Sequence, residues 1–159
     1  MKGWIQLKFR IVDKGYFKVI GFMETVQING SGTFIPNYNE SNREQIQETL
    51  EQLLNERISN IFNIVINKSD QLVDSYIGIE TEAICPPSLV EVAIPKQTWA
   101  VFEIVSLAPY VINKTWHDLF AFWFPVHGYE LADNVEFYLE KREHNRFELW
   151  IPVKKRPFS

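Results

Sequence analysis

The chain has 159 residues, of which 46% are hydrophobic, 23% charged and 14% aromatic, and its formal net charge is −4. These proportions are typical of a soluble globular protein, and we expect a single domain over 1–159. A net negative charge argues against a nucleic-acid partner, which requires a basic surface. The one cysteine, Cys85, excludes an intramolecular disulfide. Since no signal peptide or long apolar segment is visible, we expect a cytoplasmic protein that does not bind membranes.

The first half of the chain predicts two strands and a long helix. Apolar residues alternate over 4–12, as they do in a strand with one buried face, and after a break at 13–15 a second strand is expected over 17–23. Ser41 and Glu44 then have the spacing of a capping box, which marks the start of a helix. The apolar residues that follow recur at helical period, and we therefore expect a helix over 41–64.

The second half predicts a similar series of elements. These are strands over 76–83, 89–94 and 99–105, a second helix that begins after Asn113 or Thr115 and ends before Pro125, and a closing hairpin of 135–140 and 147–153. The order strand, helix, strand, strand thus occurs twice, at about 17–95 and 98–153. It predicts an α+β fold of two tandem βαββ repeats. The expected sheet is antiparallel or mixed, with the two main helices on one face and a ligand cleft on the other.

The closing hairpin carries the residues that suggest a function. Glu148 and Trp150 of its last strand, and Glu136 and Tyr138 of the strand before, alternate with apolar residues. If the aliphatic sides of both strands share one face, the residue numbers of cross-strand partners add to an even value. Tyr138 then lies opposite Trp150 or, in a register two residues shorter, opposite Glu148.

A carboxylate among aromatic rings is a suitable site for an apolar cation. Burial raises the pKa of the acid, a bound cation relieves that penalty, and each ring face adds about 0.5–2 kcal/mol of cation–π attraction. Neither a metal nor another cofactor is needed. The predicted ligand-binding residues are Glu148, Trp150, Tyr138, Trp99, Trp123, Glu136 and Tyr76.

Structural explanations of the same residues stay open. Trp123 also completes a helical stripe with Trp116, Leu119 and Phe120, which is typical of a hydrophobic core. Glu136, together with Glu140, is also compatible with a solvated strand face. The three histidines and Cys85 show no metal-ligand spacing, and we expect no metal site.

Several segments match the pattern of one family. Ile94–Pro95 precedes Trp99–Phe102, residues 123–129 read Trp-Phe-Pro-Val-His-Gly-Tyr, and the hairpin strands read Val-Glu-Phe-Tyr and Phe-Glu-Leu-Trp-Ile-Pro-Val. Together they resemble the GyrI-like, or AraC-type effector-binding, domain, which is also the drug-binding part of the multidrug regulator BmrR. The resemblance implies a central cleft for hydrophobic, often cationic, small molecules and a ligand-facing carboxylate at Glu148. Residues 35–39 depart from the family's usual Ile-Pro-x-Leu-Trp.

We therefore expect a stand-alone module that recognises or sequesters a small hydrophobic, cationic molecule. An output to transcription would need a protein partner, because both repeats together account for the whole sequence. One alternative is an interaction protein, such as an inhibitor of DNA gyrase. Another is a hydrolase of strained electrophiles, in which Glu148 and Tyr138 would be the catalytic residues. Binding without catalysis is the favoured prediction.

Overall fold

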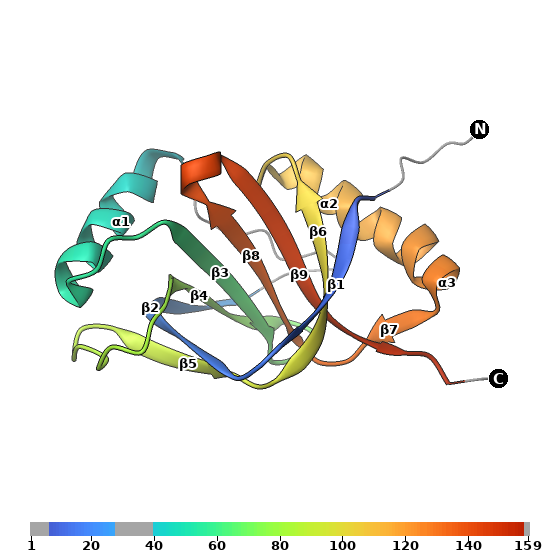
Figure 1. Ribbon diagram of the computed structural model, residues 1–159, viewed down its shortest axis with the longest axis horizontal. Coiled ribbons are helices and arrows are strands. Elements are labelled where there is room, and N and C mark those ends of the chain that lie inside the picture. The colour runs from blue at the N-terminus through green and yellow to red at the C-terminus, as the bar shows by residue number, and fades with distance from the viewer. Residues whose placement is uncertain (1–6, 28–39, 158–159) are drawn as a thin grey trace.

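A single antiparallel sheet organises the chain in the computed structural model, which describes residues 7–27 and 40–157 (Figure 1). Its strand order is β1-β6-β9-β8-β3-β4-β2-β5, with β7 paired to β9. The strands are β1 (Phe9–Lys14), β2 (Phe17–Gln27), β3 (Asn60–Asn67), β4 (Leu72–Glu80), β5 (Val90–Ile94), β6 (Gln97–Ile104), β7 (Tyr129–Leu131), β8 (Val135–Lys141) and β9 (Arg146–Lys155). The helices are α1 (Glu40–Leu54), α2 (Pro109–Asp118), the π segment η1 (Leu119–Trp123), α3 (Phe124–His127) and the 3₁₀ turn η2 (Arg142–His144).

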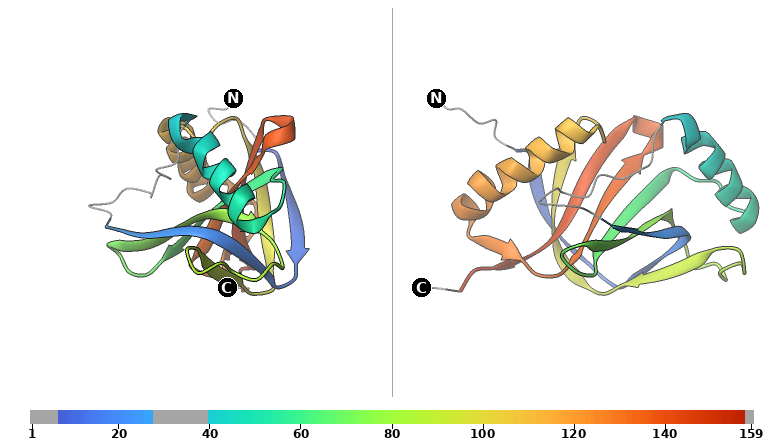
Figure 2. Two further views of the ribbon diagram at one scale, coloured as in Figure 1. Left: turned by 90° about the vertical axis from the view of Figure 1, so that its left-hand side faces the viewer. Right: turned by 180° about the vertical axis from the view of Figure 1, so that it is seen from behind.

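Both main helices lie on the same side of the sheet, as expected (Figure 2). Leu50 and Leu54 of α1 pack on isoleucines of β2, β3 and β4. Trp116 of α2 and Leu119 of η1 pack on aliphatic and aromatic residues of β6, β8 and β9. The two helices therefore cover different halves of one sheet face. None of the helices in the described part of the chain is long and apolar enough to span a membrane.

The other face of the sheet curves around a core of aromatic rings. The rings of Phe137, Trp99 and Trp150 contact one another, with the Phe137 centroid 5.0 Å from each indole and the two indoles 6.2 Å apart. Phe17 of β2 contacts Phe137 at 5.8 Å, which joins the two halves of the sheet. These rings are almost completely buried. Since they fill the helix-free face, a ligand cleft on that face is not confirmed.

The prediction of a helix over 41–64 is correct only for its first part. The helix ends at Leu54, the following Asn55 has a left-handed φ of 52°, and residues 60–67 form β3 instead of a continued helix. Both faces of β3 are buried, Ile61 against α1 and Phe62 against the ring core, and so its sequence shows no alternation. Apolar residues at 58, 61 and 62 then imitate a helical stripe. The β-branched residues of this segment favour the strand.

The second helix is longer than expected at both ends. It begins at Pro109, where proline is favoured because the first turn needs no N–H from that position. In η1 the Phe124 N–H bonds the carbonyl of Leu119, five residues earlier, and the helix passes Pro125 to end at Gly128 with φ 70°. The prediction that it ends before Pro125 is wrong, because a single wide π turn is not visible in apolar spacing.

The remaining expected strands are confirmed within a few residues, as β1, β2, β4, β5, β6, β8 and β9. Residues 4–6 of the first expected strand, residues 35–39 and the side chain of Ser41 lie outside the described part of the chain.

The expected register of the closing hairpin is wrong. Phe137 pairs with Trp150, Tyr138 with Leu149 and Leu139 with Glu148, so the paired numbers add to an odd value. The prediction assumed one apolar face and one polar face. Here both faces are buried, and the aliphatic side of β9 faces the helices while the aliphatic side of β8 faces the ring core. Tyr138 and Glu148 consequently lie on opposite faces of the sheet.

Candidate functional site

The register divides the predicted site residues into two groups. Glu148, Trp150 and Trp99 belong to the helix-free face, and Tyr76 packs against the same ring core from β4. Glu136, Tyr138 and Trp123 belong to the helix face. The structure therefore does not bring the seven residues into one pocket, and the two groups are best considered separately.

On the helix-free face, Glu148 is held by two cations. Its Oε2 lies 3.2 Å from Nη1 of Arg10 and 3.2 Å from Nζ of Lys141. The indole N–H of Trp150 donates to Oε1 at 3.0 Å. Burial raises the pKa of Glu148, but the hydrogen bonds from Trp150, Arg10 and Lys141 outweigh it and hold the pKa below its ordinary value. The charge of this acid is already neutralised within the protein.

Trp123 serves the core. It stacks on Tyr129 with centroids 5.4 Å apart and planes 9° from parallel, and on His127 at 5.0 Å. Phe9 and Phe102 make T-shaped contacts with it, at centroid distances of 5.2 and 5.0 Å. This packing supports the structural explanation of the helical stripe over a role in ligand binding.

On the helix face, three side chains form a hydrogen-bonded chain. The indole N–H of Trp116, on α2, donates to the Tyr138 hydroxyl at 3.1 Å. The Tyr138 hydroxyl in turn donates to Oε2 of Glu136 at 3.4 Å. Because Glu136 and Tyr138 are two residues apart on β8, they share a face, and α2 supplies the third group. We call Glu136, Tyr138 and Trp116 the Glu136 site.

Glu136 differs from Glu148 in its charge environment. Burial raises the pKa of Glu136 to about 7, against smaller opposing effects of hydrogen bonds from Tyr138 and Asn67. Among the described residues, no Lys, Arg or His lies within ion-pair distance of its carboxylate. Burial, followed by the neighbouring Glu136 carboxylate, also raises the pKa of Tyr138 well above its ordinary value. The acid is half-buried and uncompensated, which is the condition that a cationic ligand relieves.

The Glu136 site lies at the boundary between the areas covered by the two helices. Figure 1 shows β8 and β3 between α1 and α2. Phe120 of η1 stacks on Trp116 with centroids 5.7 Å apart and is 57% exposed, so an aromatic surface continues from the site toward solvent. This position combines an acid, a phenol and two aromatic rings on one side of the sheet.

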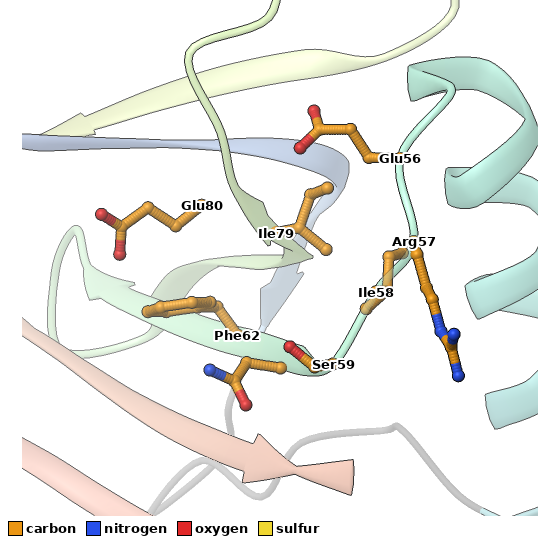
Figure 3. Close-up of a pocket in the computed structure, with 8 residues that line it drawn as sticks. Glu56, Arg57, Ile58, Ser59, Phe62, Ile79 and Glu80 are labelled. Atoms are coloured by element: carbon orange, nitrogen blue, oxygen red, sulfur yellow. The ribbon is translucent and has the colours of Figure 1, made fainter. Parts of the chain in front are cut away.

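A separate hollow of about 270 Å³ lies where α1 leads into β3 (Figure 3). Glu56, Glu80 and Phe62 are among the residues that line it, and the side chain of Arg57 points away from the two carboxylates. Glu56 accepts a hydrogen bond from Thr81, and Glu80 pairs with Lys14 at 3.1 Å. Of these two acids only Glu80 therefore has a cationic partner, and the Thr81 hydroxyl is a neutral donor to Glu56.

The fold is that of a small-molecule-binding domain. The chain belongs to the GyrI-like small molecule binding domain family, whose model matches residues 7–154. No protein with a curated description matches the sequence.

Solved structures with this fold include proteins of transcription regulation and a ligand complex. A Staphylococcus aureus MU50 protein assigned to bacterial transcription regulation has a TM-score of 0.63 at 14% identity, over 94% of this chain and 99% of that one. SAV2435, bound to tetraphenylphosphonium, has a TM-score of 0.64 at 15% identity, over 92% and 94%. The C-terminal domain of EcmrR has a TM-score of 0.56 at 13% identity, over 95% and 99%. At these identities the likeness establishes the fold alone.

Sequence reasoning missed three contributors to these clusters. Arg10 and Lys141 meet Glu148 from two other strands, and only the sheet register could have revealed them. Trp116 appeared only as a core residue, although its indole N–H orients Tyr138. A buried aromatic residue with a polar group usually finds a partner, so its N–H was the one available signal.

Proposed function

We propose that this domain binds a hydrophobic cation and that Glu136 neutralises the charge of the ligand. The observation that carries the proposal is the contrast between two acids: Glu148 has two cationic partners, whereas Glu136 has none among the described residues and a pKa raised to about 7. A ligand cation supplies the partner that Glu136 lacks. SAV2435, which has the same fold, forms a complex with tetraphenylphosphonium, and this supports a ligand of this class.

The aromatic residues beside Glu136 would provide the apolar part of recognition. Trp116 and Phe120 form a stacked pair, and Tyr138 lies between Trp116 and the acid. Each ring face within reach of the cation contributes about 0.5–2 kcal/mol. Buried apolar ligand surface adds about 25 cal/mol per Å². Recognition of the ligand would then depend on the charge of Glu136, on the aromatic rings and on the fit of the apolar surface. It would need neither a metal nor a covalent bond.

We also infer that the domain consists of two tandem βαββ units and that its ligand cleft lies on the helix face. In the unit β2-α1-β3-β4, strand β4 lies between β2 and β3. In the unit β6-α2-β8-β9, strand β9 lies between β6 and β8 in the same way. The units meet where β3 pairs with β8, and this junction carries the Glu136 site.

The test is binding of tetraphenylphosphonium, with tetraphenylborate as an anion of the same shape. We expect the cation, and not the anion, to bind the wild-type domain. Glu136→Gln should weaken cation binding at least about tenfold, about 1.4 kcal/mol. Glu148→Gln is the matched control and should leave the affinity unchanged. If Glu148→Gln abolishes binding and Glu136→Gln does not, the ligand carboxylate is Glu148, and the site includes Trp150, Trp99 and Tyr76.

The hydrolase alternative needs a different pair of residues from the predicted one. Glu148 and Tyr138 lie on opposite faces of the sheet and cannot meet one substrate. Tyr138 has Glu136 as its acidic neighbour. The gyrase-inhibitor alternative stays a prediction, as does a protein partner that would convert ligand binding into a transcriptional response.

A further inference from the structure

Asn63 is a buried polar residue with an unused hydrogen-bond donor. It lies on β3, directly opposite Tyr138, and is 4% exposed. Its Nδ2 has no hydrogen-bond partner among the described residues. The great majority of buried side-chain polar atoms in proteins do have a partner, and an exception in a native structure needs an explanation.

The side chain directly opposite Asn63, that of Tyr138, does not satisfy its donor. The Tyr138 hydroxyl accepts the Trp116 N–H and donates to Glu136. The residues beside Asn63 on the same face of β3 are Ile61 and Val65, which offer no side-chain acceptor. The amide therefore presents its N–H₂ on the floor of the helix face, beside the hydrogen-bonded chain that ends at Glu136.

Asn63 is also well placed relative to Glu136. Glu136 pairs with Val65, so Asn63 is its diagonal cross-strand neighbour on the same face. Such neighbours are about 7–8 Å apart. This separation corresponds to a few bonds of a small molecule.

We propose that Asn63 is a specificity residue of the ligand site and that its side-chain amide donates a hydrogen bond to an acceptor oxygen of the ligand. This inference rests on the proposed function at Glu136. It narrows the ligand from any hydrophobic cation to one that also carries a carbonyl or similar acceptor a few bonds from its charge.

The test uses two matched phosphonium cations. The first is (4-oxo-4-phenylbutyl)triphenylphosphonium, and the second is (4-phenylbutyl)triphenylphosphonium, which has a methylene in place of the ketone. We expect the wild-type domain to bind the ketone about fivefold more tightly, as a single net hydrogen bond allows. Asn63→Leu removes the donor while keeping the number and branching of the side-chain heavy atoms, and it should bind both cations equally, with the affinity for the methylene compound unchanged.

Thermal unfolding of the unliganded variant separates this role from a structural one. Because the Asn63 amide is unsatisfied, Asn63→Leu should have the same Tm as wild type or a higher one. A lower Tm together with a retained preference for the ketone would overturn the inference. If Asn63→Leu does not fold, the inference is tested by the affinities of the wild-type protein for the ketone and the methylene cation. A preference for the ketone supports it, and equal affinities refute it.

The outcomes also separate this inference from the proposed function. Equal binding of both phosphonium cations by wild type, with loss of both in Glu136→Gln, would refute the role of Asn63 and leave the cation site standing. If wild type binds neither cation, or if Glu136→Gln binds both as well as wild type, the proposed function itself is wrong. The inference about Asn63 then falls with it.

Discussion

The Tyr138 hydroxyl lies 3.4 Å from Oε2 of Glu136 and is oriented by the Trp116 N–H, which it accepts. Since the oxygen of Tyr138 accepts from Trp116, its own proton is directed to the acid. Helix α2 thus fixes the phenol, and the phenol fixes the carboxylate. This chain gives Glu136 a defined position, although no described residue supplies a counter-charge.

Cation affinity should depend on pH near neutrality. Burial raises the pKa of Glu136 to about 7, and only the ionised acid attracts a cation. Between about pH 6 and about pH 8 its ionised fraction rises about tenfold, and the association constant of tetraphenylphosphonium should rise by about the same factor. Titration calorimetry at several pH values measures this change. In Glu136→Gln the affinity for the cation should be weak and independent of pH. If the affinity still changes with pH in this variant, a group other than Glu136 titrates.

Glu136→Gln should stabilise the unliganded protein at high pH. The pKa of Glu136 is raised from 4.5 to about 7 on folding, so the folded state binds more protons than the unfolded state between these values. The free energy of unfolding therefore falls as pH rises through this window. Neutral glutamine avoids that loss, and we expect a gain of up to about 3 kcal/mol at about pH 8 and little change at about pH 4. Urea denaturation at both pH values measures the difference; equal gains at both would contradict the ionisation argument.

Tyr138→Phe should move the pH midpoint of cation binding upward. The Tyr138 hydrogen bond favours the ionised form of Glu136 and lowers its pKa, so its removal leaves the acid more difficult to ionise. The variant also leaves the buried Trp116 N–H without its acceptor, which should cost about 1–3 kcal/mol of stability. The pH profile of binding distinguishes the two effects, because loss of stability alone does not displace the midpoint. An unchanged midpoint would mean that Tyr138 does not act on Glu136.

Glu148→Gln should destabilise the fold and leave cation binding intact. Glu148 is almost fully buried, and its removal leaves Arg10 and Lys141 without their shared partner. We expect the free energy of unfolding to fall by roughly 2 kcal/mol. This is less than the usual cost of breaking a fully buried ion pair, because Arg10 is half exposed. The folded-state pKa of Glu148 is lowered, so its contribution is present above the ordinary carboxylate pKa and disappears as pH falls through the folded value. Chemical denaturation at neutral and acidic pH tests both statements.

The sequence predicts the elements whose two faces differ in polarity. The amphipathic part of α1 has one solvent side opposite the buried Leu50 and Leu54, and its periodicity located it. Periodicity did not identify β3, because Ile61 and Phe62 are buried on opposite faces of the strand. The spacing of apolar residues alone could not distinguish a strand from a helix there. The wide π turn before Pro125 had no signal in composition at all.

The candidate site shows the same limit. Glu136, Tyr138 and Glu148 were recognised as acids and phenols among apolar residues, which is a local property. Whether Tyr138 meets Glu148 depends on one residue of register, and burial of both sheet faces removed the polarity that would have fixed it. The ion pairs of Glu148 with Arg10 and Lys141 arise from strand order, which a single sequence does not display.

The release of protons on ligand binding tests the central claim most directly. Tetraphenylphosphonium is titrated into the domain at about pH 7 in two buffers of different ionisation enthalpy, and the difference in apparent binding enthalpy counts the protons released. With the pKa of Glu136 at about 7, wild type should release about half a proton per bound cation, and Glu136→Gln none. Tight binding by wild type with no proton released would contradict the account, because the cation would then meet an acid that is already ionised.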